Sequence, residues 1–253
     1  MEFRSYPNPL LGNPFNLPDG IQNATPYYWF MQKLTQFAMT SFFNIRAFNR
    51  HFEPAEGGVV LASNHQSFLD PPIVGMALKR PCNFMARSTL FKNPVFSKFI
   101  SSVNAMPIKR GTADTAAMKE SVRRLKNGRQ IVIFPEGTRS KDGKIAKFLP
   151  GMALLSQRAA TWTLPAVIDG AFDAWPRSQK IPSMKKVYVA YGEPIHRDEA
   201  RKYKSAEFVK MLRERLIHMQ CRLREHIGKQ PYDYSDEFGD SIPGAPASDI
   251  AIS

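Results

Sequence analysis

The sequence predicts an α/β fold with a largely parallel central sheet flanked by helices and preceded by an amphipathic N-terminal helix. Short apolar runs that are typical of buried strands alternate with segments whose apolar residues recur every three or four positions. Such an alternation of strands and helices is typical of a parallel sheet covered on both faces. The length of 253 residues fits one domain with extensions, and the 43% of hydrophobic residues supplies a sizeable core.

Composition divides the chain into three regions. Residues 1–50 hold an irregular segment rich in Pro, Asn and Gly, followed by the amphipathic helix. Residues 51–229 carry the alternating strands and helices of the main domain. Residues 230–253 contain acids, Gly and Pro but no Lys or Arg, which predicts an acidic and flexible tail.

The N-terminal helix is expected to run from Pro26 to about Phe48. Thr25 resembles an N-cap, and Pro26 suits the first helical position. Polar residues interrupt the aromatic-rich stripe of this helix, which argues against a membrane span and favours a helix lying in the membrane plane. The alternative is packing of the stripe on the protein's own domain, and different faces of one helix can do both.

The main domain is expected to alternate strands with helices in chain order. Pro71 suits the first turn of the helix after the first strand, and Asn127-Gly128 is typical of a helix end. The expected strands are short apolar or extended runs at Val59–Ser63, Asn83–Ala86, Ala105–Ile108, Gln130–Phe134, Thr163–Ile168 and Lys186–Tyr191. The expected helices are Asp70–Lys79, Asn93–Val103, Ala113–Lys126, Met152–Ala159 and Ser205–Ile227.

The charge of the chain favours an anionic partner. The formal net charge is +13, and because the tail holds five acids and no basic residue, residues 1–229 carry +18. A body this basic favours lipid headgroups, nucleic acid or an acidic carrier protein, and charge alone does not choose among them.

The cysteines, the N-terminus and the longest apolar runs indicate the cellular compartment. Cys82 and Cys221 show neither metal-ligand spacing nor a disulfide framework, which favours buried free thiols in a reducing compartment. The N-terminus has no apolar core of a secretory signal, and no window approaches the length of a transmembrane helix. We therefore expect a cytoplasmic protein bound peripherally to the cytoplasmic face of a membrane.

His65 is the first candidate catalytic residue. It follows the apolar run Val59–Ser63, and so it lies at the carboxyl end of an expected strand, where α/β sheets place their ligands. Asp70 begins the next expected helix, and a turn between the two can bring its carboxylate onto one imidazole nitrogen. That contact would fix the tautomer and leave the other nitrogen free to accept a proton.

The sequence offers no obvious protein nucleophile for this base. It contains no Gly-x-Ser-x-Gly run, and neither cysteine lies in a recognisable nucleophile motif. The histidine is therefore expected to act directly on a substrate hydroxyl, without an acyl-enzyme intermediate.

A second polar turn follows the expected strand Gln130–Phe134. Gly137 allows the backbone to approach a ligand closely, and Arg139 can bind a phosphate through two parallel hydrogen bonds. Glu136 can accept a hydrogen bond from a hydroxyl or hold a neighbouring arginine. The stretch from Gly137 to Ile145 superficially resembles a nucleotide phosphate loop. It has one residue too many between Gly137 and Gly143, and Ile145 stands where Ser or Thr would bind magnesium.

Together these segments resemble the 1-acylglycerol-3-phosphate O-acyltransferase family of glycerolipid acyltransferases. The resemblance covers roughly residues 57–195 and rests on the order and spacing of its motifs. The motifs are Asn64-His65-x4-Asp70, Ala105-Met-Pro-Ile-Lys-Arg110, Phe134-Pro-Glu-Gly-Thr-Arg139 and Leu164-Pro165-Ala-Val-Ile168, with Arg87-Ser-Thr-Leu90 in place of the family's Lys-x-x-Leu. The second motif departs from the family, because Pro107-Ile108-Lys109 replaces the usual large apolar residue and acid.

The resemblance implies a role for each matched residue. His65 would be the general base and Asp70 its partner. The acceptor phosphate and glycerol would be bound by Arg110, Glu136, Gly137, Thr138 and Arg139. No cofactor or metal is implied, and the co-substrate would be acyl-CoA or acyl-carrier protein.

The implied reaction moves a fatty acyl group from this thioester to the free hydroxyl of a lysophospholipid, with 1-acyl-glycerol-3-phosphate as the expected acceptor and phosphatidic acid as the product. The expected partners are the lysophospholipid, the acyl donor and an anionic membrane surface. Alternatives are another lysolipid acceptor, a lipid ester hydrolase, or a non-catalytic membrane-binding module. Nucleic acid is disfavoured, because the sequence has no zinc spacing, no aromatic RNA-binding signature and no evident recognition helix.

Overall fold

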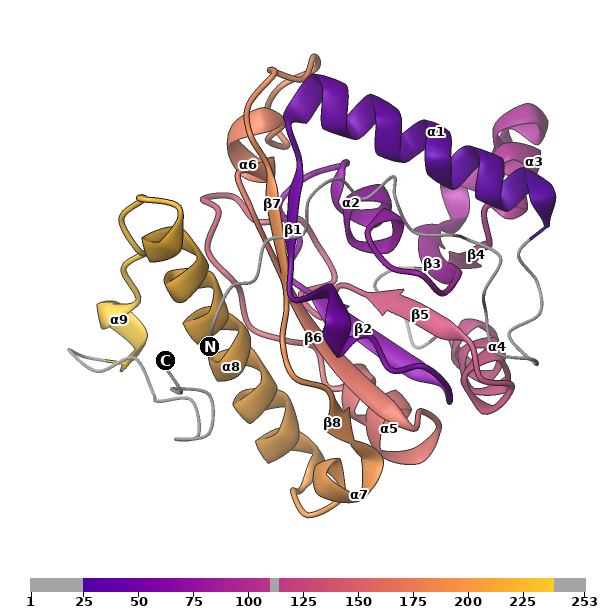
Figure 1. Ribbon diagram of the computed structural model, residues 1–253. Coiled ribbons are helices and arrows are strands. Elements are labelled where there is room, and N and C mark those ends of the chain that lie inside the picture. Colours follow the sequence, from indigo (N-terminus) through magenta and orange to yellow (C-terminus); the bar gives the residue numbers. More distant parts are fainter. Residues whose placement is uncertain (1–24, 110–113, 239–253) are drawn as a thin grey trace.

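The computed structural model describes residues 25–109 and 114–238 and is built around an eight-stranded sheet. Its strand order is β1-β7-β6-β2-β5-β3-β4, with β8 beside β6 (Figure 1). Strand β6 pairs antiparallel with β7 and β8, and every other pairing is parallel, so the expected α/β class is confirmed. The strands are β1 Arg46–Phe48, β2 Val59–Ser63, β3 Cys82–Arg87, β4 Ala105–Ile108, β5 Gln130–Ile133, β6 Trp162–Asp169, β7 Tyr188–Tyr191 and β8 Ile195–His196.

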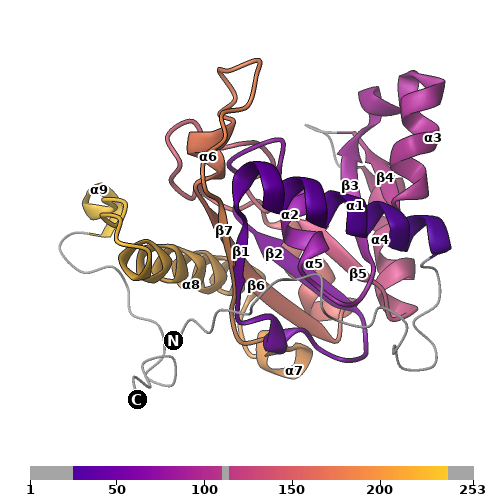
Figure 2. The same ribbon diagram turned by 45° about the horizontal axis from the view of Figure 1, so that its top comes forward.

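Helices cover both faces of the sheet. Figures 1 and 2 show α1 and α2 on one face and α5 and α8 on the other, and a buried apolar cluster lies under each layer. The α-helices are α1 Pro26–Phe43, α2 Asp70–Met76, α3 Pro94–Ser102, α4 Thr115–Lys126, α5 Gly151–Arg158, α6 Ala171–Ala174, α7 Arg197–Ala200, α8 Ser205–His226 and α9 Ser235–Phe238. Among the described residues, the 3-10 helix η2 Arg50–Phe52 follows β1, and the 3-10 helix η3 Ser88–Lys92 lies between β3 and α3.

Helix α1 begins where the sequence predicts but ends earlier. The hydroxyl of Thr25 accepts a hydrogen bond from the Tyr28 N–H, as an N-cap does. The expectation that the helix reaches Phe48 is wrong. Asn44 adopts a left-handed conformation with φ of 42° and stops the helix. The next residues form β1, whose backbone pairs with β7 at the edge of the sheet.

The two faces of α1 have different surroundings. On the inner face the Tyr28 hydroxyl accepts a hydrogen bond from the Cys82 N–H at 3.0 Å, and the Gln32 and Gln36 side chains donate to carbonyl groups at the end of α2. On the outer face Phe30 and Phe37 are 62% and 61% exposed. In the described part of the chain, no helix combines the length and hydropathy that a membrane crossing requires.

The predicted loose tail is wrong for its first residues. Tyr234 is buried, and its hydroxyl donates to Gln220 and accepts from the Ile145 N–H. Glu237 forms an ion pair with the mostly buried Arg213 at 2.8 Å. Residues 230–238 therefore pack on α8, because Tyr234 hydrogen-bonds to Gln220 and Glu237 pairs with Arg213, both on that helix. Residues 239–253 lie outside the described residues, as do residues 1–24.

Candidate active site

The parallel pairing of β2, β5 and β6 brings three loops to one edge of the sheet. Ala62 of β2 lies opposite Ile133 of β5, and Ser63 lies opposite Ala166 of β6. The carboxyl ends of these strands therefore meet, and the loops that follow them carry the two polar motifs. The sequence prediction that His65 and the 134–140 turn share one edge agrees with this register.

His65 and Asp70 form a buried pair. The His65 Nδ1 lies 2.7 Å from the Asp70 Oδ2, and Asp70 is fully buried. The same carboxylate oxygen accepts the backbone N–H groups of Gln66 at 2.5 Å and Ser67 at 2.7 Å. Three donors thus fix the carboxylate from one side, and the imidazole keeps its Nε2 for a ligand.

The backbone and the ring of His65 are held by the loop that follows β5. The His65 N–H donates to the Glu136 Oε1 at 2.7 Å, and the His65 carbonyl accepts from the Ser140 N–H at 2.7 Å. The imidazole stacks on the Phe134 ring with centroids 4.2 Å apart. These contacts leave the imidazole little freedom to change its orientation, as a positioned base requires.

Glu136 uses both carboxylate oxygens on the backbone. Its Oε1 accepts from His65 and its Oε2 accepts from the Ala146 N–H at 2.9 Å. Burial raises the pKa of Glu136 to about 7, although these two backbone N–H groups oppose the rise, and the nearby charge of Asp70 adds to it. The expected contact of Glu136 with a glycerol hydroxyl is therefore less favoured by this geometry than a role in positioning His65.

The 134–140 turn presents Arg139 beside His65. Gly137 has φ of 68°, and a Cβ there would lie 2.7 Å from the Leu149 side chain, so the turn requires glycine. The Arg139 guanidinium lies over the Phe68 ring at 3.4 Å from its centroid. Thr138 is exposed. Arg110, the other expected phosphate ligand, lies outside the described residues.

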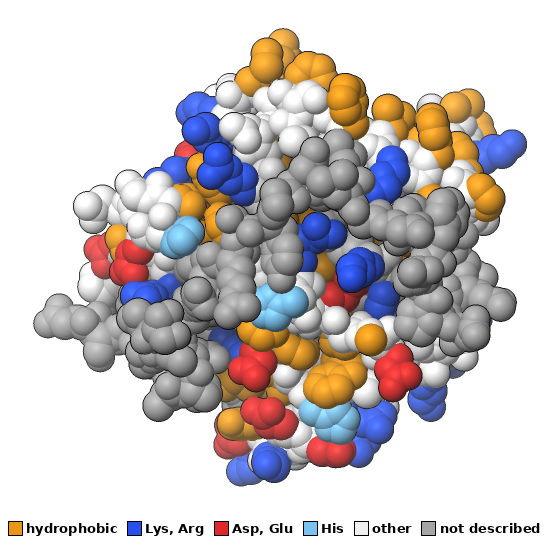
Figure 3. All heavy atoms as spheres, in the orientation of Figure 1, with side chains coloured by type: hydrophobic (Ala, Val, Ile, Leu, Met, Phe, Trp, Pro, Cys, Tyr) orange, Lys and Arg blue, Asp and Glu red, His pale blue; other side chains and the backbone are white. Residues whose placement is uncertain are grey.

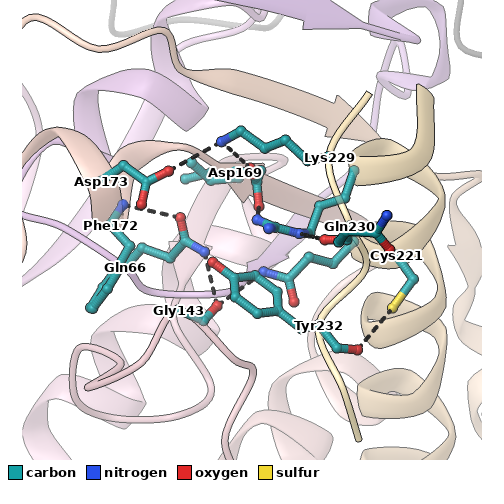
Figure 4. A network of polar contacts seen from close by, with 12 residues as sticks. Gln66, Gly143, Asp169, Phe172, Asp173, Cys221, Lys229, Gln230 and Tyr232 are labelled. Carbon is teal, nitrogen blue, oxygen red and sulfur yellow. Dashed lines mark hydrogen bonds and ion pairs between the residues drawn. The ribbon is translucent and has the colours of Figure 1, made fainter. Parts of the chain in front are cut away.

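A polar network supports the loop that carries His65 (Figure 4). The Gln66 side chain donates to the Gly143 carbonyl at 2.9 Å and accepts from the Phe172 N–H. On the same side, the fully buried Asp169 pairs with Arg224 and Lys229 at 2.7 and 3.1 Å. Arg224 and Lys229 thereby join the end of α8 to the end of β6.

A cavity of about 830 Å³ opens beside His65 and Arg139. This volume lies within the range of roughly 300–1,000 Å³ that is typical of ligand sites. The cavity extends from His65 below α1 toward α3. Its apolar lining includes Met31, Met39, Met76, Phe84, Met85, Leu90, Phe96, Phe99, Ile100 and Val103.

Several parts of the site carry no signal in the sequence that we recognised. Phe134 and Phe68 stand inside the two motifs, but only the fold places their rings against His65 and Arg139. Gln66 adjoins His65, yet its partners Gly143 and Phe172 are distant in the chain. Across residues 25–109 and 114–238, no three His, Cys, Asp or Glu side chains are placed to hold a metal ion.

Comparison with known proteins agrees with these motifs. A family model described as acyltransferase matches residues 44–169. The 1-acyl-sn-glycerol-3-phosphate acyltransferase of Bacillus subtilis is 28% identical over 185 residues, which are 71% of this chain and 89% of that protein. The chloroplastic enzyme of that name from Arabidopsis thaliana, LPAT1, is 31% identical over 56% of this chain, but the match spans only 40% of its length.

The fold also has a solved counterpart. The crystal structure of the 1-acyl-sn-glycerophosphate acyltransferase PlsC of Thermotoga maritima superposes with a TM-score of 0.66 and covers 81% of each chain. Its sequence identity to this chain is 24%, so this likeness concerns the fold.

Replacing Glu136 tests its raised pKa through stability. The unfolded chain releases this proton near pH 4.5, whereas the folded protein holds it to about pH 7. As the pH rises from about 4.5 to about 7, the free energy of unfolding of the wild type should therefore fall relative to that of Glu136→Gln, by up to roughly 3 kcal/mol. Urea unfolding at pH 5 and pH 8 measures the difference, with Glu193→Gln at an exposed carboxylate as the control. A wild-type-to-variant difference that does not change with pH would contradict the assignment.

Proposed function

This chain belongs to the acyltransferase family, and from that premise we propose that it transfers a fatty acyl group from acyl-CoA or acyl-carrier protein to a lysophospholipid. We propose 1-acyl-glycerol-3-phosphate as the acceptor and phosphatidic acid as the product. The acceptor class is supported by the names of the relatives and by Arg139, which can bind a phosphate monoester.

One observation carries the proposal. The His65–Asp70 pair lies at the wall of an apolar cavity whose lining also includes Arg139. A lysophospholipid with an acidic headgroup needs these three features together: a base for its hydroxyl, a cation for its phosphate and an apolar volume for a chain. A general hydrolase of soluble esters needs no such combination.

The reaction requires one proton transfer in each direction. The His65 Nε2 accepts the acceptor's hydroxyl proton while that oxygen attacks the thioester carbonyl carbon. The tetrahedral intermediate then collapses, the carbon–sulfur bond breaks and the imidazolium returns its proton to the leaving thiolate. General-base assistance of this kind contributes typically ~10²–10⁴-fold to a rate.

The neighbouring residues position this chemistry. Asp70 holds the Nδ1 proton of His65 and balances the imidazolium charge when it forms. Glu136 holds the His65 backbone and acts as a positioning residue. Arg139 binds the acceptor phosphate, and we retain Arg110 as a second phosphate ligand by its motif alone. The cavity below α1 takes an acyl chain, because its lining is apolar and continuous with His65.

The same protein would dock on a membrane through α1. Its outer face exposes Phe30, Leu34, Phe37 and Phe42. Burial of such side chains in a bilayer contributes about 1.5–3 kcal/mol each at most. We place the protein peripherally on the cytoplasmic face of a membrane, where the lysolipid can reach His65 from the membrane plane.

An acceptor panel tests the proposed function. The protein is mixed with acyl-CoA or acyl-carrier protein and with lysophospholipids that differ in headgroup, and the products are weighed by mass spectrometry. The proposal predicts a diacyl product, formed fastest from the lysolipid with a phosphate monoester. Release of free fatty acid without a diacyl product would favour the hydrolase, and absence of both reactions would favour a non-catalytic membrane module.

Replacing the base should remove activity without unfolding the protein. His65→Ala should lower kcat by about 100-fold or more, and Asp70→Asn should be nearly as damaging because the imidazole loses its orientation. Steady-state kinetics measures both. His196→Ala is the matched control, because it removes a partly exposed histidine that contacts Asp198 far from the cavity. A folded His65→Ala variant within a few-fold of the wild type would refute the assignment.

Replacing Arg139 should affect the acceptor more than the donor. Arg139→Lys keeps the charge but removes the planar pair of donors and the close stacking on Phe68. KM for 1-acyl-glycerol-3-phosphate should rise by about tenfold or more, while KM for the acyl donor changes little. Each substrate is varied in turn, and Arg123→Lys on exposed α4 is the control. Equal effects on both substrates would speak against phosphate binding.

Replacing the outer face of α1 should separate docking from chemistry. Phe30→Ser, Leu34→Ser and Phe37→Ser together should release the protein from anionic vesicles and cut activity on vesicle substrate. Activity on a short-chain soluble acceptor and the melting temperature should be retained, because these side chains are exposed. Leu154→Ser with Tyr203→Ser, two partly exposed positions elsewhere, is the control. A large loss of thermal stability in the triple variant would instead indicate packing on the domain.

A further inference from the structure

The loop between α6 and β7, residues 175–187, combines exposed apolar side chains with basic ones. It holds Arg177, Lys180, Lys185 and Lys186 and no acid. At its tip Ile181 and Met184 are each 79% exposed, more than any large apolar residue of α1. Neighbouring exposed apolar side chains with a polar or charged rim mark partner or membrane contacts when they form a patch.

None of these four cations forms an ion pair within the described residues, and each is exposed. Their charge is therefore available to an external anion. A surface cluster of Lys and Arg next to apolar side chains is the pattern that binds anionic bilayers.

The loop has a defined conformation. The Ser183 N–H donates to the Ala174 carbonyl at 2.7 Å and closes the base of the loop. The Trp175 indole N–H donates to the Gln179 carbonyl at 3.1 Å. The apolar tip is thus held away from the core by its own backbone contacts.

The exit of the loop is joined to the end of α1. The Val187 N–H donates to the carbonyl of Phe43, the last residue of α1, and the Val187 carbonyl accepts from the Arg46 N–H. Figures 1 and 2 show the loop rising beside this end of α1, on the same side of the molecule as α3. In Figure 3 hydrophobic side chains gather along this upper rim, with Lys and Arg below the loop.

The root of the loop reaches the proposed active site. Trp175 lines the cavity together with Phe68 and Arg139, and its ring contacts Phe68 with centroids 5.4 Å apart. The Ser67 hydroxyl donates to the Trp175 carbonyl at 2.9 Å. Ser67 and Phe68 lie between His65 and Asp70, so the loop is connected to the segment that carries the base.

We propose that this loop is a second membrane-insertion element, which buries Ile181 and Met184 in an anionic bilayer while its Lys and Arg side chains bind lipid phosphates. It extends the docking face of α1 across the cavity entrance, and this inference rests on the proposed membrane docking of that face. With α1 alone the molecule could rock about the helix axis. Contact at the loop as well fixes its tilt and holds the Trp175 side of the cavity at the lipid surface.

A fluorescent label at the loop tip tests insertion directly. Ile181→Cys is coupled to an environment-sensitive dye, which is selective because the native Cys82 and Cys221 are buried. On phosphatidylcholine vesicles containing phosphatidylglycerol, the emission should move to shorter wavelength and gain intensity, and less so on phosphatidylcholine alone. The same dye on Lys202→Cys, beside α7, should not respond. Absence of vesicle binding, or binding without a response at position 181, overturns the inference.

Variants measure how much the loop contributes. Ile181→Ser with Met184→Ser should weaken co-sedimentation with these vesicles by about tenfold or more. Lys180→Gln with Lys185→Gln should weaken it by about tenfold at low salt and little at high salt. Lys126→Gln with Lys202→Gln makes the same change in net charge on exposed residues of α4 and the α7 end, and it should have a small effect. Equal effects of the two lysine pairs would overturn the role of the loop.

The design separates this inference from the proposed function. The dye and the sedimentation require no acyl transfer, whereas wild-type activity on a soluble short-chain acceptor tests the function by itself. The Ile181→Ser, Met184→Ser variant should retain that soluble activity. Acyl-carrier protein is the other anionic partner that the loop could meet. A dye response to acyl-carrier protein and none to vesicles would overturn the bilayer proposal.

Discussion

The Glu136 carboxylate accepts the His65 N–H, and the position of the imidazole depends on this bond. The contact joins the loop after β2 to the loop after β5, two segments about 70 residues apart that meet only because their strands pair in parallel. The cost is a buried acid beside Asp70, and its pKa rises to about 7. A carboxyl group in such surroundings is destabilising by itself when ionised, which suits a group whose function is to hold the base.

The sequence was sufficient for the order of the longer strands and helices of the main domain, though not for the short α6, β8 and α7, and for the meeting of the two motifs at one sheet edge. Those predictions rest on local periodicity, which is visible within each segment, and on the general rule that neighbouring parallel strands place their carboxyl ends at the same edge of the sheet. The end of α1 was predicted too late, because the left-handed Asn44 is a single-residue event and the three residues of β1 are defined only by their partner β7. Packing of residues 230–238 was missed because Tyr234 and Glu237 complete contacts with Gln220 and Arg213, which no local pattern records.

In the candidate site, too, some features could be predicted from the sequence and others depend on contacts between distant segments. His65, Asp70 and Arg139 stand in motifs whose chemistry can be read from residue types. The two backbone partners of Glu136 favour a support for His65 over the expected contact with substrate. The apolar cavity could not be predicted, since α1, α2, β3 and α3 each supply part of its wall. In the proposed docking, the outer surface of α1 and the tip of the 175–187 loop would face the lipid together.

In the proposed reaction His65 activates the acceptor hydroxyl directly, without a covalent acyl-enzyme. The most direct test is a single-turnover experiment with a radiolabelled acyl thioester, in which intact-protein mass, thiol release and lipid products are followed together. We expect an unmodified protein and negligible thiol release without acceptor, and one thiol released per diacyl product once 1-acyl-glycerol-3-phosphate is added. An acylated protein formed before acceptor addition, or thiol release matched by free fatty acid, would contradict this proposal.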